Sequence, residues 1–264
     1  MIIRVPGHFG ELIQGRMGPD GPVALISLPC PALAVEAQPA PLPDPHGLLP
    51  PARARALLSL LGLPDPGPYA LTASMPRGGG AGASTAALVA LARLAGSRHL
   101  PEELARACVA VEGASDPLMF PAPERLLWAS RQAKVILTLP NLPTFDVIGG
   151  FFGPNRRTDP ADDRFPDITD LIAPWQAAAT AGDMSAVAAL ASLSADRTLA
   201  MRQKAPDPTP TLALVTGALG YVIAHTGSAR ALLFAKGADL RGVQDRMARA
   251  GFRRIVSFGA GGKG

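Results

Sequence analysis

One stretch of the sequence, residues 69–94, limits the possible folds more than any other. It runs from a short apolar segment through Pro76 into the glycines at 78, 79, 80 and 82, and then into Ser84, Thr85 and an apolar run. This order predicts a strand, a tight loop and the N-terminus of a helix. Glycine permits left-handed turns and close approach to a ligand, and the free N–H groups and dipole of a helix N-terminus attract anions. The stretch therefore predicts a phosphate-binding loop.

The composition limits the remaining possibilities. The chain has 264 residues, of which 48% are hydrophobic and 17% are charged, so it can bury the core of one large domain or two modest ones. The net charge of +4 comes from scattered arginines with few aromatic residues between them, which argues against a nucleic-acid partner. Cys30 and Cys108 lie in apolar contexts without metal-ligand spacing, and we expect both to be buried thiols.

No stretch of the sequence has the length and apolar character of a membrane span, and residues 1–12 lack the apolar core of a signal peptide. We therefore expect a cytoplasmic protein with no membrane partner.

Apolar patterning and turn residues predict an α+β fold, with an antiparallel sheet in the second half of the chain and no internal repeat. The expected strands are 1–6, 22–28, 32–37, 69–73, 134–139, 144–152, 221–224, 229–235 and 252–258. The expected helices are 52–61, 84–95, one opened by Pro101, 169–181, 183–204 with Asp183 as its N-cap, 211–220, and one capped by Asp239. The expected turn is 6–15, and the expected loops are 39–51 and 153–166. A proline-bounded linker at 140–143 suggests two domains, 1–142 and 143–264.

Two common phosphate loops do not fit the glycine stretch. A Walker A loop needs a lysine before the hydroxyl residue, and none precedes Ser84, whereas Gly262-Lys263-Gly264 has the lysine but no hydroxyl. A dinucleotide fingerprint needs an acidic residue at the end of a second strand, but Glu102 and Glu103 open a helix instead.

Three segments together resemble the motifs of the GHMP kinases, the family of galactokinase, homoserine kinase and mevalonate kinase. Residues 76–86 resemble the second motif, P-x-G-x-G-x-x-S-S-A, although Ala83 replaces its first serine. Residues 6–15, PGHFGELIQG, are similar to the first motif in the L-threonine kinase branch used in cobalamin synthesis. Residues 217–229 resemble the glycine-rich third motif. The three segments occur in the family order.

The resemblance implies a two-domain fold, with an N-terminal α+β nucleotide-binding domain and a ferredoxin-like C-terminal domain that has an antiparallel sheet. It also implies an ATP-dependent kinase that phosphorylates a small hydroxyl compound, with ATP and Mg²⁺ as cofactors and L-threonine as the expected acceptor. The residues expected to bind ATP are Pro76, Arg77, Gly78, Gly79, Gly80, Ala81, Gly82, Ala83, Ser84 and Thr85.

Roles for the other site residues follow from the same resemblance. Ser84 and Glu112 are expected to bind the metal ion, and Asp116 is expected to act with Ser84 in catalysis, as the base that accepts the hydroxyl proton. The residues expected to bind the acceptor are Gly7, His8, Glu11, Gln14, His225, Thr226 and Gly227. Structural alternatives stay open: Ser84 as a helix cap, Glu112 paired with an arginine, and Asp116 as a turn residue.

Two departures from the family pattern leave other functions open. His8-Phe9 stands where the first motif usually has small, hydroxyl or thiol residues, and Ala83 lacks a hydroxyl. The acceptor could instead be homoserine or an isoprenoid alcohol. A protein that binds the nucleotide but has lost catalysis, and acts as a sensor, is the alternative from another class.

Overall fold

A computed structural model describes residues 1–41, 47–156, 159, 161–202 and 206–262. The strands are β1 (Ile3–Arg16), β2 (Val23–Pro39), β3 (Tyr69–Ala73), β4 (Leu126–Ala129), β5 (Lys134–Thr138), β6 (Phe145–Phe151), β7 (Gly220–Ile223), β8 (Ala229–Ala235) and β9 (Arg253–Ala260). The helices are α1 (Pro51–Leu60), α2 (Ala83–Leu94), α3 (Pro101–Glu112), the 3₁₀ turn η1 (Pro123–Arg125), α4 (Thr169–Ala181), α5 (Met184–Arg202), α6 (Thr209–Thr216) and α7 (Val243–Arg249). The expected helix end at Lys204, the Lys263-Gly264 pair and parts of the loops 39–51 and 153–166 lie outside the described residues.

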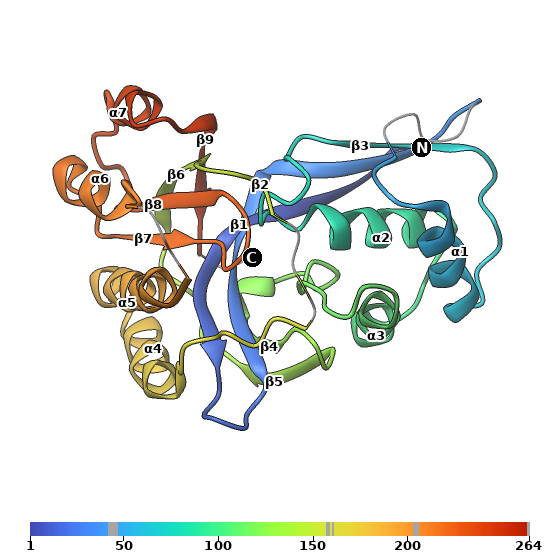
Figure 1. Ribbon diagram of the computed structural model, residues 1–264, viewed down its shortest axis with the longest axis horizontal. Helices are drawn as coiled ribbons and strands as arrows, with labels where there is room; N and C mark the ends of the chain where they lie inside the picture. Colours follow the sequence, from blue (N-terminus) through green and yellow to red (C-terminus); the bar gives the residue numbers. More distant parts are fainter. Residues whose placement is uncertain (42–46, 157–158, 160, 203–205, 263–264) are drawn as a thin grey trace.

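The strands form one nine-stranded sheet in the order β5-β4-β2-β1-β7-β8-β6-β9, with β3 paired to β2. All strand pairs within this sheet are antiparallel, which confirms the prediction made for the second half of the chain. Figure 1 shows β1 and β2 running as long, curved ribbons between the group of β6 to β9 and the group of α1 to α3. The two long strands therefore connect the N-terminal and C-terminal halves of the molecule.

The predicted turn at 6–15 is wrong, because these residues lie within the single strand β1. The predicted break at Pro29-Cys30-Pro31 is also wrong, since β2 continues through it. The pairing of β1 with β2 shifts register between Pro6 and Gly7, where the partner residue changes from Ala34 to Cys30. Such a bulge tolerates prolines, which lack the N–H that a regular ladder needs, and it bends the strand. Further shifts between His8 and Ile13 give β1 the irregular backbone that looked like a turn in the sequence.

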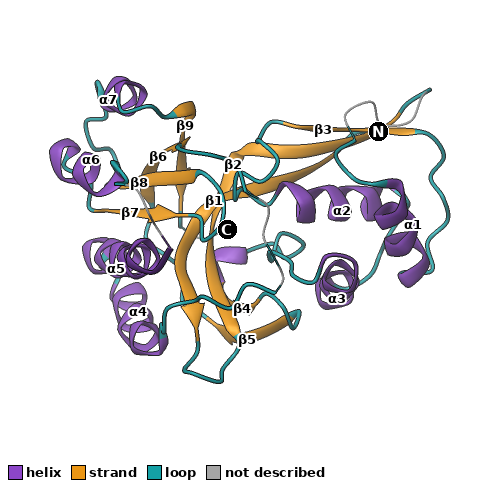
Figure 2. Cartoon of the chain, viewed as in Figure 1, coloured by secondary structure: helices purple, strands orange, loops and turns teal. Residues whose placement is uncertain are grey.

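The helices lie in separate groups around the sheet (Figure 2). Helix α2 packs against β1 and β2 with α1 and α3 beside it, and α5 packs against β1 and β7 with α4 beside it. The predicted helices 52–61, 84–95 and 169–181 are confirmed within a residue or so, as is the helix opened by Pro101. Asp183 caps α5 as predicted, since its Oδ1 accepts from the backbone N of Ala186 at 3.0 Å.

Two other helix predictions are wrong at their ends, and one strand was missed. Helix α6 ends at Thr216, so Gly220 begins β7 instead of ending a helix. Helix α7 starts after Gly242, whereas Asp239 accepts hydrogen bonds from Arg241. Strand β4 is too short to show a clear apolar period.

Among the described residues, no helix is both long and apolar enough to span a membrane.

One hydrophobic core extends across the two halves of the chain. The ring of Phe9 on β1 lies 5.0 Å from that of Phe151 on β6 and 6.2 Å from that of Phe258 on β9, centroid to centroid. Cys30 and Cys108 are buried free thiols, as predicted. This packing fixes the bulged part of β1 against the C-terminal strands. The division into two domains at 142/143 stays a prediction.

Candidate active site

The glycine loop connects β3 to α2, in the arrangement that the sequence predicted. Gly78, Gly80 and Gly82 have φ values of +68°, +73° and +74°, a region that residues with a side chain rarely adopt. Gly82 directly precedes the first turn of α2 and provides no side-chain cap. The N-terminal N–H groups of this helix are therefore free to bind an anion.

Residues from the C-terminal half hold the loop in place. The backbone N atoms of Ser228 and Ala229 donate to the carbonyl of Gly79 at 3.0 and 2.8 Å, and the N of Arg156 donates to the carbonyl of Gly78 at 2.8 Å. Gly227 packs so closely that a Cβ added there would lie 2.6 Å from the backbone of Gly79. The second and third sequence motifs thus meet, although they are far apart in the chain.

A cleft of about 260 Å³ lies beside this loop. It is lined by the whole predicted ATP-binding segment and by every other predicted site residue except two glycines. The predicted residues that line it are Pro76–Thr85, His8, Glu11, Gln14, Glu112, Asp116, His225 and Thr226. Gly7 and Gly227 instead lie against the loop backbone, where a Cβ at Gly7 would meet the carbonyl O of Ala81 at 2.5 Å.

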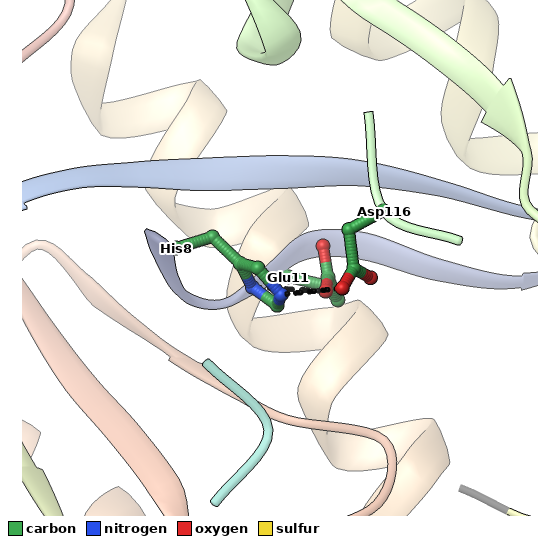
Figure 3. A group of neighbouring side chains, drawn as sticks. All are labelled: His8, Glu11 and Asp116. Carbon is green, nitrogen blue, oxygen red and sulfur yellow. Dashed lines mark ion pairs between the residues drawn. The ribbon is translucent and has the colours of Figure 1, made fainter. Parts of the chain in front are cut away.

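His8 lies between two carboxylates in this cleft (Figure 3). Its Nδ1 is 3.2 Å from Oε1 of Glu11, and its Nε2 is 3.3 Å from Oδ2 of Asp116. Thr85, at the start of α2, accepts from the backbone N of Asp116 at 3.2 Å and donates to its carboxylate at 3.4 Å. Asp116 is thereby connected both to β1 and to the helix that follows the glycine loop.

The three charges shift each other's protonation. Burial lowers the pKa of His8, but the carboxylates of Glu11 and Asp116 outweigh it and raise the pKa to about 10. Burial raises the pKa of Glu11 to about 8, against the attraction of His8. Burial also favours protonated Asp116, yet His8 keeps the pKa of Asp116 below its usual range. At neutral pH, His8 is therefore a cation and Asp116 an anion that can accept a proton, while the raised pKa of Glu11 keeps most of that carboxyl protonated.

The same three side chains also form a potential metal-binding group, since their ligand atoms all lie within 4.8 Å of one another. A protonated imidazole cannot bind a metal ion, because both of its nitrogen atoms carry hydrogen. The contacts with the carboxyl groups of Glu11 and Asp116 explain the position of His8 without a bound metal ion.

Ser84 and Glu112, the predicted metal ligands, lie side by side at the start of α2 and the end of α3. The hydroxyl of Ser84 donates to Oε1 of Glu112, and Arg53 on α1 lies 2.8 Å from the same oxygen. Burial raises the pKa of Glu112, while Ser84 and Arg53 oppose the shift. The arginine partner that the sequence left as an alternative is therefore present. Two hard oxygen ligands still meet beside the glycine loop, so these residues also fit a magnesium ion.

His225 has a different environment from the one expected of an anion-binding residue. Its ring stacks on Phe165 with 3.7 Å between centroids, and its Nε2 lies 3.0 Å from Nη1 of Arg202. Burial and then the charge of Arg202 lower the pKa of His225 to about 4. The imidazole is neutral at pH 7, and its Nδ1 faces the hydroxyl of Thr226 at 3.1 Å.

The sequence analysis missed several residues that line the cleft, among them Arg53, Arg131, Arg156 and Phe165. Arg156 and Phe165 lie in the loop between β6 and α4, Arg53 on α1 and Arg131 between β4 and β5, and none belongs to a motif. Only Arg53 could have been anticipated, because Glu112 lies at a helix end, where a carboxylate needs a compensating positive charge. The sequence did not show that the partner would come from α1.

Comparison with solved structures identifies the class of fold: it is the fold of the GHMP kinases, as predicted. The chain is similar to phosphomevalonate kinase from Streptococcus pneumoniae, with TM-score 0.65, 12% identity, and 99% of each chain covered. It is similar to the putative homoserine kinase of Listeria monocytogenes, with TM-score 0.64, 16% identity, and 100% of this chain and 99% of the other covered.

A second structure of the S. pneumoniae enzyme, in complex with phosphomevalonate and AMPPNP, matches with TM-score 0.61 and 11% identity over 98% of this chain and 100% of the other. No protein-family model matches the sequence, and no curated protein matches it either.

Proposed function

We propose that the protein is an ATP-dependent kinase that phosphorylates the hydroxyl of L-threonine to give O-phospho-L-threonine for cobamide synthesis. The observation that carries the kinase assignment is the contact between Thr85 and Asp116. It joins a carboxylate suited to accept a proton directly to the helix whose N-terminus follows the glycine loop. A phosphoryl donor and an acceptor hydroxyl would thus meet in one cleft.

The glycine loop would bind the triphosphate of ATP. Residues 76–85 line the cleft, and α2 presents its free N-terminal N–H groups there. A structural neighbour was solved with AMPPNP, an ATP analogue, which supports a nucleotide in this fold. Arg156, whose backbone N bonds to Gly78, would add positive charge beside the phosphates.

In the proposed reaction, the acceptor oxygen attacks the γ-phosphorus of ATP as the bond from this phosphorus to the β–γ bridging oxygen breaks. ADP leaves with that oxygen, and the hydroxyl proton passes to Asp116. His8 keeps Asp116 ionised before the transfer, which is the state a base requires. Thr85 orients the carboxylate by its two hydrogen bonds.

Ser84 and Glu112 would hold the Mg²⁺ ion that accompanies ATP. When bound, the ion neutralises charge on the phosphate oxygens. The Ser84 hydroxyl and the Glu112 carboxylate contribute oxygen ligands next to the loop, and Arg53 keeps Glu112 in place.

Threonine as the acceptor rests on the similarity of residues 6–15 to one branch of the family. Within this motif, His8, Glu11 and Gln14 line the cleft, while Gly7 lies against the loop backbone. His225 and Thr226 line it from the third motif.

The test is release of ADP from ATP and Mg²⁺ with a panel of acceptors: L-threonine, L-serine, L-homoserine and mevalonate. We expect threonine to give the highest kcat/KM. Turnover with homoserine or mevalonate alone would keep the kinase and replace its substrate. Tight binding of ATP without turnover of any acceptor would favour the sensor and overturn the kinase assignment.

A further inference from the structure

Three polar atoms that belong to cleft-lining residues have no hydrogen-bond partner among the described residues. They are Oε2 of Glu11, Oε1 of Gln14 and Oγ of Ser115. These residues are only 6%, 2% and 3% exposed. A buried polar atom without a partner is costly, so native proteins rarely keep one unless a ligand or water binds it. Their position in one cleft indicates a ligand that supplies the missing bonds.

Glu11 and Gln14, the two motif residues among these three, each have an oxygen that can accept a further hydrogen bond. The ligand must therefore supply hydrogen-bond donors. Nε2 of Gln14 donates to the carbonyl of Ile223 at 3.0 Å, so the amide oxygen is the atom left without a partner. Oε1 of Glu11 lies 3.2 Å from His8, and the neighbouring Ser27 hydroxyl lowers the pKa of this carboxyl, but the second oxygen still has room for a further donor. An ammonium group carries several N–H donors that suit both oxygens, and its positive charge would lower the pKa of Glu11 and favour the ionised carboxylate.

Arg131 contributes a positive charge to the cleft, opposite in sign to that of the Glu11 carboxylate. It follows Ser130, whose carbonyl accepts from the backbone N of Ser115 at 2.9 Å, so this turn adjoins the segment that carries Asp116. Its guanidinium lies 5.3 Å from the ring centroid of Phe165 and donates to the carbonyl of Asp162. No carboxylate among the described residues forms an ion pair with it. A planar guanidinium pairs well with a carboxylate of the same fork geometry.

The other arginines of the cleft, Arg53, Arg77 and Arg156, are placed for other tasks. Arg77 belongs to the glycine-loop segment and donates to the carbonyl of Gly47. Arg53 is paired with Glu112. Arg156 adjoins Gly78 of the glycine loop, on the side expected for ATP. Arg131 is thus the cleft arginine whose guanidinium packs over Phe165, the ring that stacks on His225, and it lies on the side expected for the acceptor.

We propose that the cleft recognises its acceptor as a zwitterionic amino acid, with Arg131 pairing with the carboxylate and with Glu11 and Gln14 accepting from the ammonium group. This inference rests on the proposed kinase function and names Arg131 as the residue that determines specificity. It predicts rejection of hydroxyl compounds that lack either charge.

The test combines acceptor analogues with variants. The acceptors are L-threonine, L-threonine amide, which lacks the carboxylate, and 3-hydroxybutyrate, which lacks the ammonium group. We expect each analogue to have a kcat/KM lower than that of threonine by about 10- to 100-fold, the range for loss of a hydrogen bond to a charged group.

Arg131→Gln should lower kcat/KM for threonine by a similar factor, about 10- to 100-fold, while changing that for threonine amide less than about threefold. Glu11→Gln should lower kcat/KM for threonine by a larger factor than that for 3-hydroxybutyrate. Arg241→Gln is the matched control, because Arg241 is almost fully exposed and pairs only with Asp239 beside it. The KM for ATP should stay unchanged in Arg131→Gln.

Equal losses of kcat/KM with threonine and its amide would overturn the role of Arg131, as would a rise in the KM for ATP alone. If no acceptor is phosphorylated, the kinase function fails, and calorimetry of threonine binding with AMPPNP present still tests recognition. Binding that Arg131→Gln weakens would support the subsite without the kinase. Absence of threonine binding to the wild-type protein would overturn the subsite.

Discussion

The Nε2 atom of His8 lies 3.3 Å from Oδ2 of Asp116, and this contact determines the protonation of the proposed base. The two residues are far apart in sequence and meet because a bulged part of β1 passes beside the segment after α3. A cation at this distance favours the ionised carboxylate, which explains why burial does not keep Asp116 protonated.

Replacing His8 with Gln should move the acid limb of the pH–rate profile to higher pH. Without the imidazolium, burial raises the pKa of Asp116, and a shift of about 1–3 units is the range for loss of such a neighbour. The measurement is kcat/KM from about pH 3 to 9 for wild type and variant, because the wild-type pKa of Asp116 lies below 3.8. His99→Gln is the control, since His99 bonds only to Ser97 and lies outside the cleft. An unchanged acid limb would contradict the coupling of His8 to Asp116.

The stability of the protein should fall as the pH rises above neutrality. The pKa of His8 is raised from 6.5 to about 10 and that of Glu11 from 4.5 to about 8. A group with a raised pKa in the folded state stabilises it fully below the unfolded value and loses this contribution as the pH rises through the folded value. The stabilisation from His8 is therefore lost between pH 6.5 and about 10, and that from Glu11 between pH 4.5 and about 8.

Urea denaturation at pH 7, 8.5 and 10 measures this effect. The free energy of unfolding of the wild type should decrease across the series, and that of the double variant His8→Gln, Glu11→Gln should decrease less. Parallel curves for the two proteins would show that this cluster is not the source of the pH dependence.

Gly227→Ala should disturb the glycine loop from a distance. A Cβ at Gly227 would lie 2.6 Å from the carbonyl carbon of Gly79, and the residue has a φ of +106°. Gly237→Ala is the control, since Gly237 also has a positive φ, +78°, but has open space around its Cβ position. Both changes should cost about 1–2 kcal/mol of backbone strain. Only Gly227→Ala should also raise the KM for ATP, by about 10- to 100-fold. A KM effect of equal size in Gly237→Ala would contradict the predicted contact.

Ser84→Ala and Glu112→Gln should both weaken the binding of Mg²⁺. Loss of one oxygen ligand should raise the Mg²⁺ concentration for half-maximal rate by about tenfold or more. Ser59→Ala, an exposed change on α1, is the control. If Glu112 only anchors Arg53, Glu112→Gln will lower stability and leave the Mg²⁺ requirement unchanged.

Most of the fold could be predicted from the sequence because the segments with the strongest local patterns form the helices and strands that those patterns predict. Helix α4 and strand β6 matched their predicted ranges closely, since each combines a clear apolar pattern with end signals. Strand β1 was misread because prolines and glycines usually mark turns, and a bulged strand uses the same residues. The bulge depends on its pairing with β2, which no local pattern contains.

The motifs predicted which segments would line the cleft, but not how their side chains pair. Asp116 and His8 were both named as site residues, whereas their mutual contact depends on the tertiary fold. Arg131 lies in the turn between β4 and β5, and its place near Asp116 follows from the bond between Ser115 and Ser130. Such pairings of distant segments leave no periodic signal in a single sequence.

The most direct test of the proposed activity is ³¹P NMR of a reaction with ATP, Mg²⁺ and L-threonine, using the wild type and Asp116→Asn. We expect the wild type to form O-phospho-L-threonine and ADP in equal amounts. Asp116→Asn should retain ATP binding and form the phosphoester at least about 100-fold more slowly, the usual contribution of a general base. Failure of the wild type to form the phosphoester, or a normal rate in Asp116→Asn, would contradict this account.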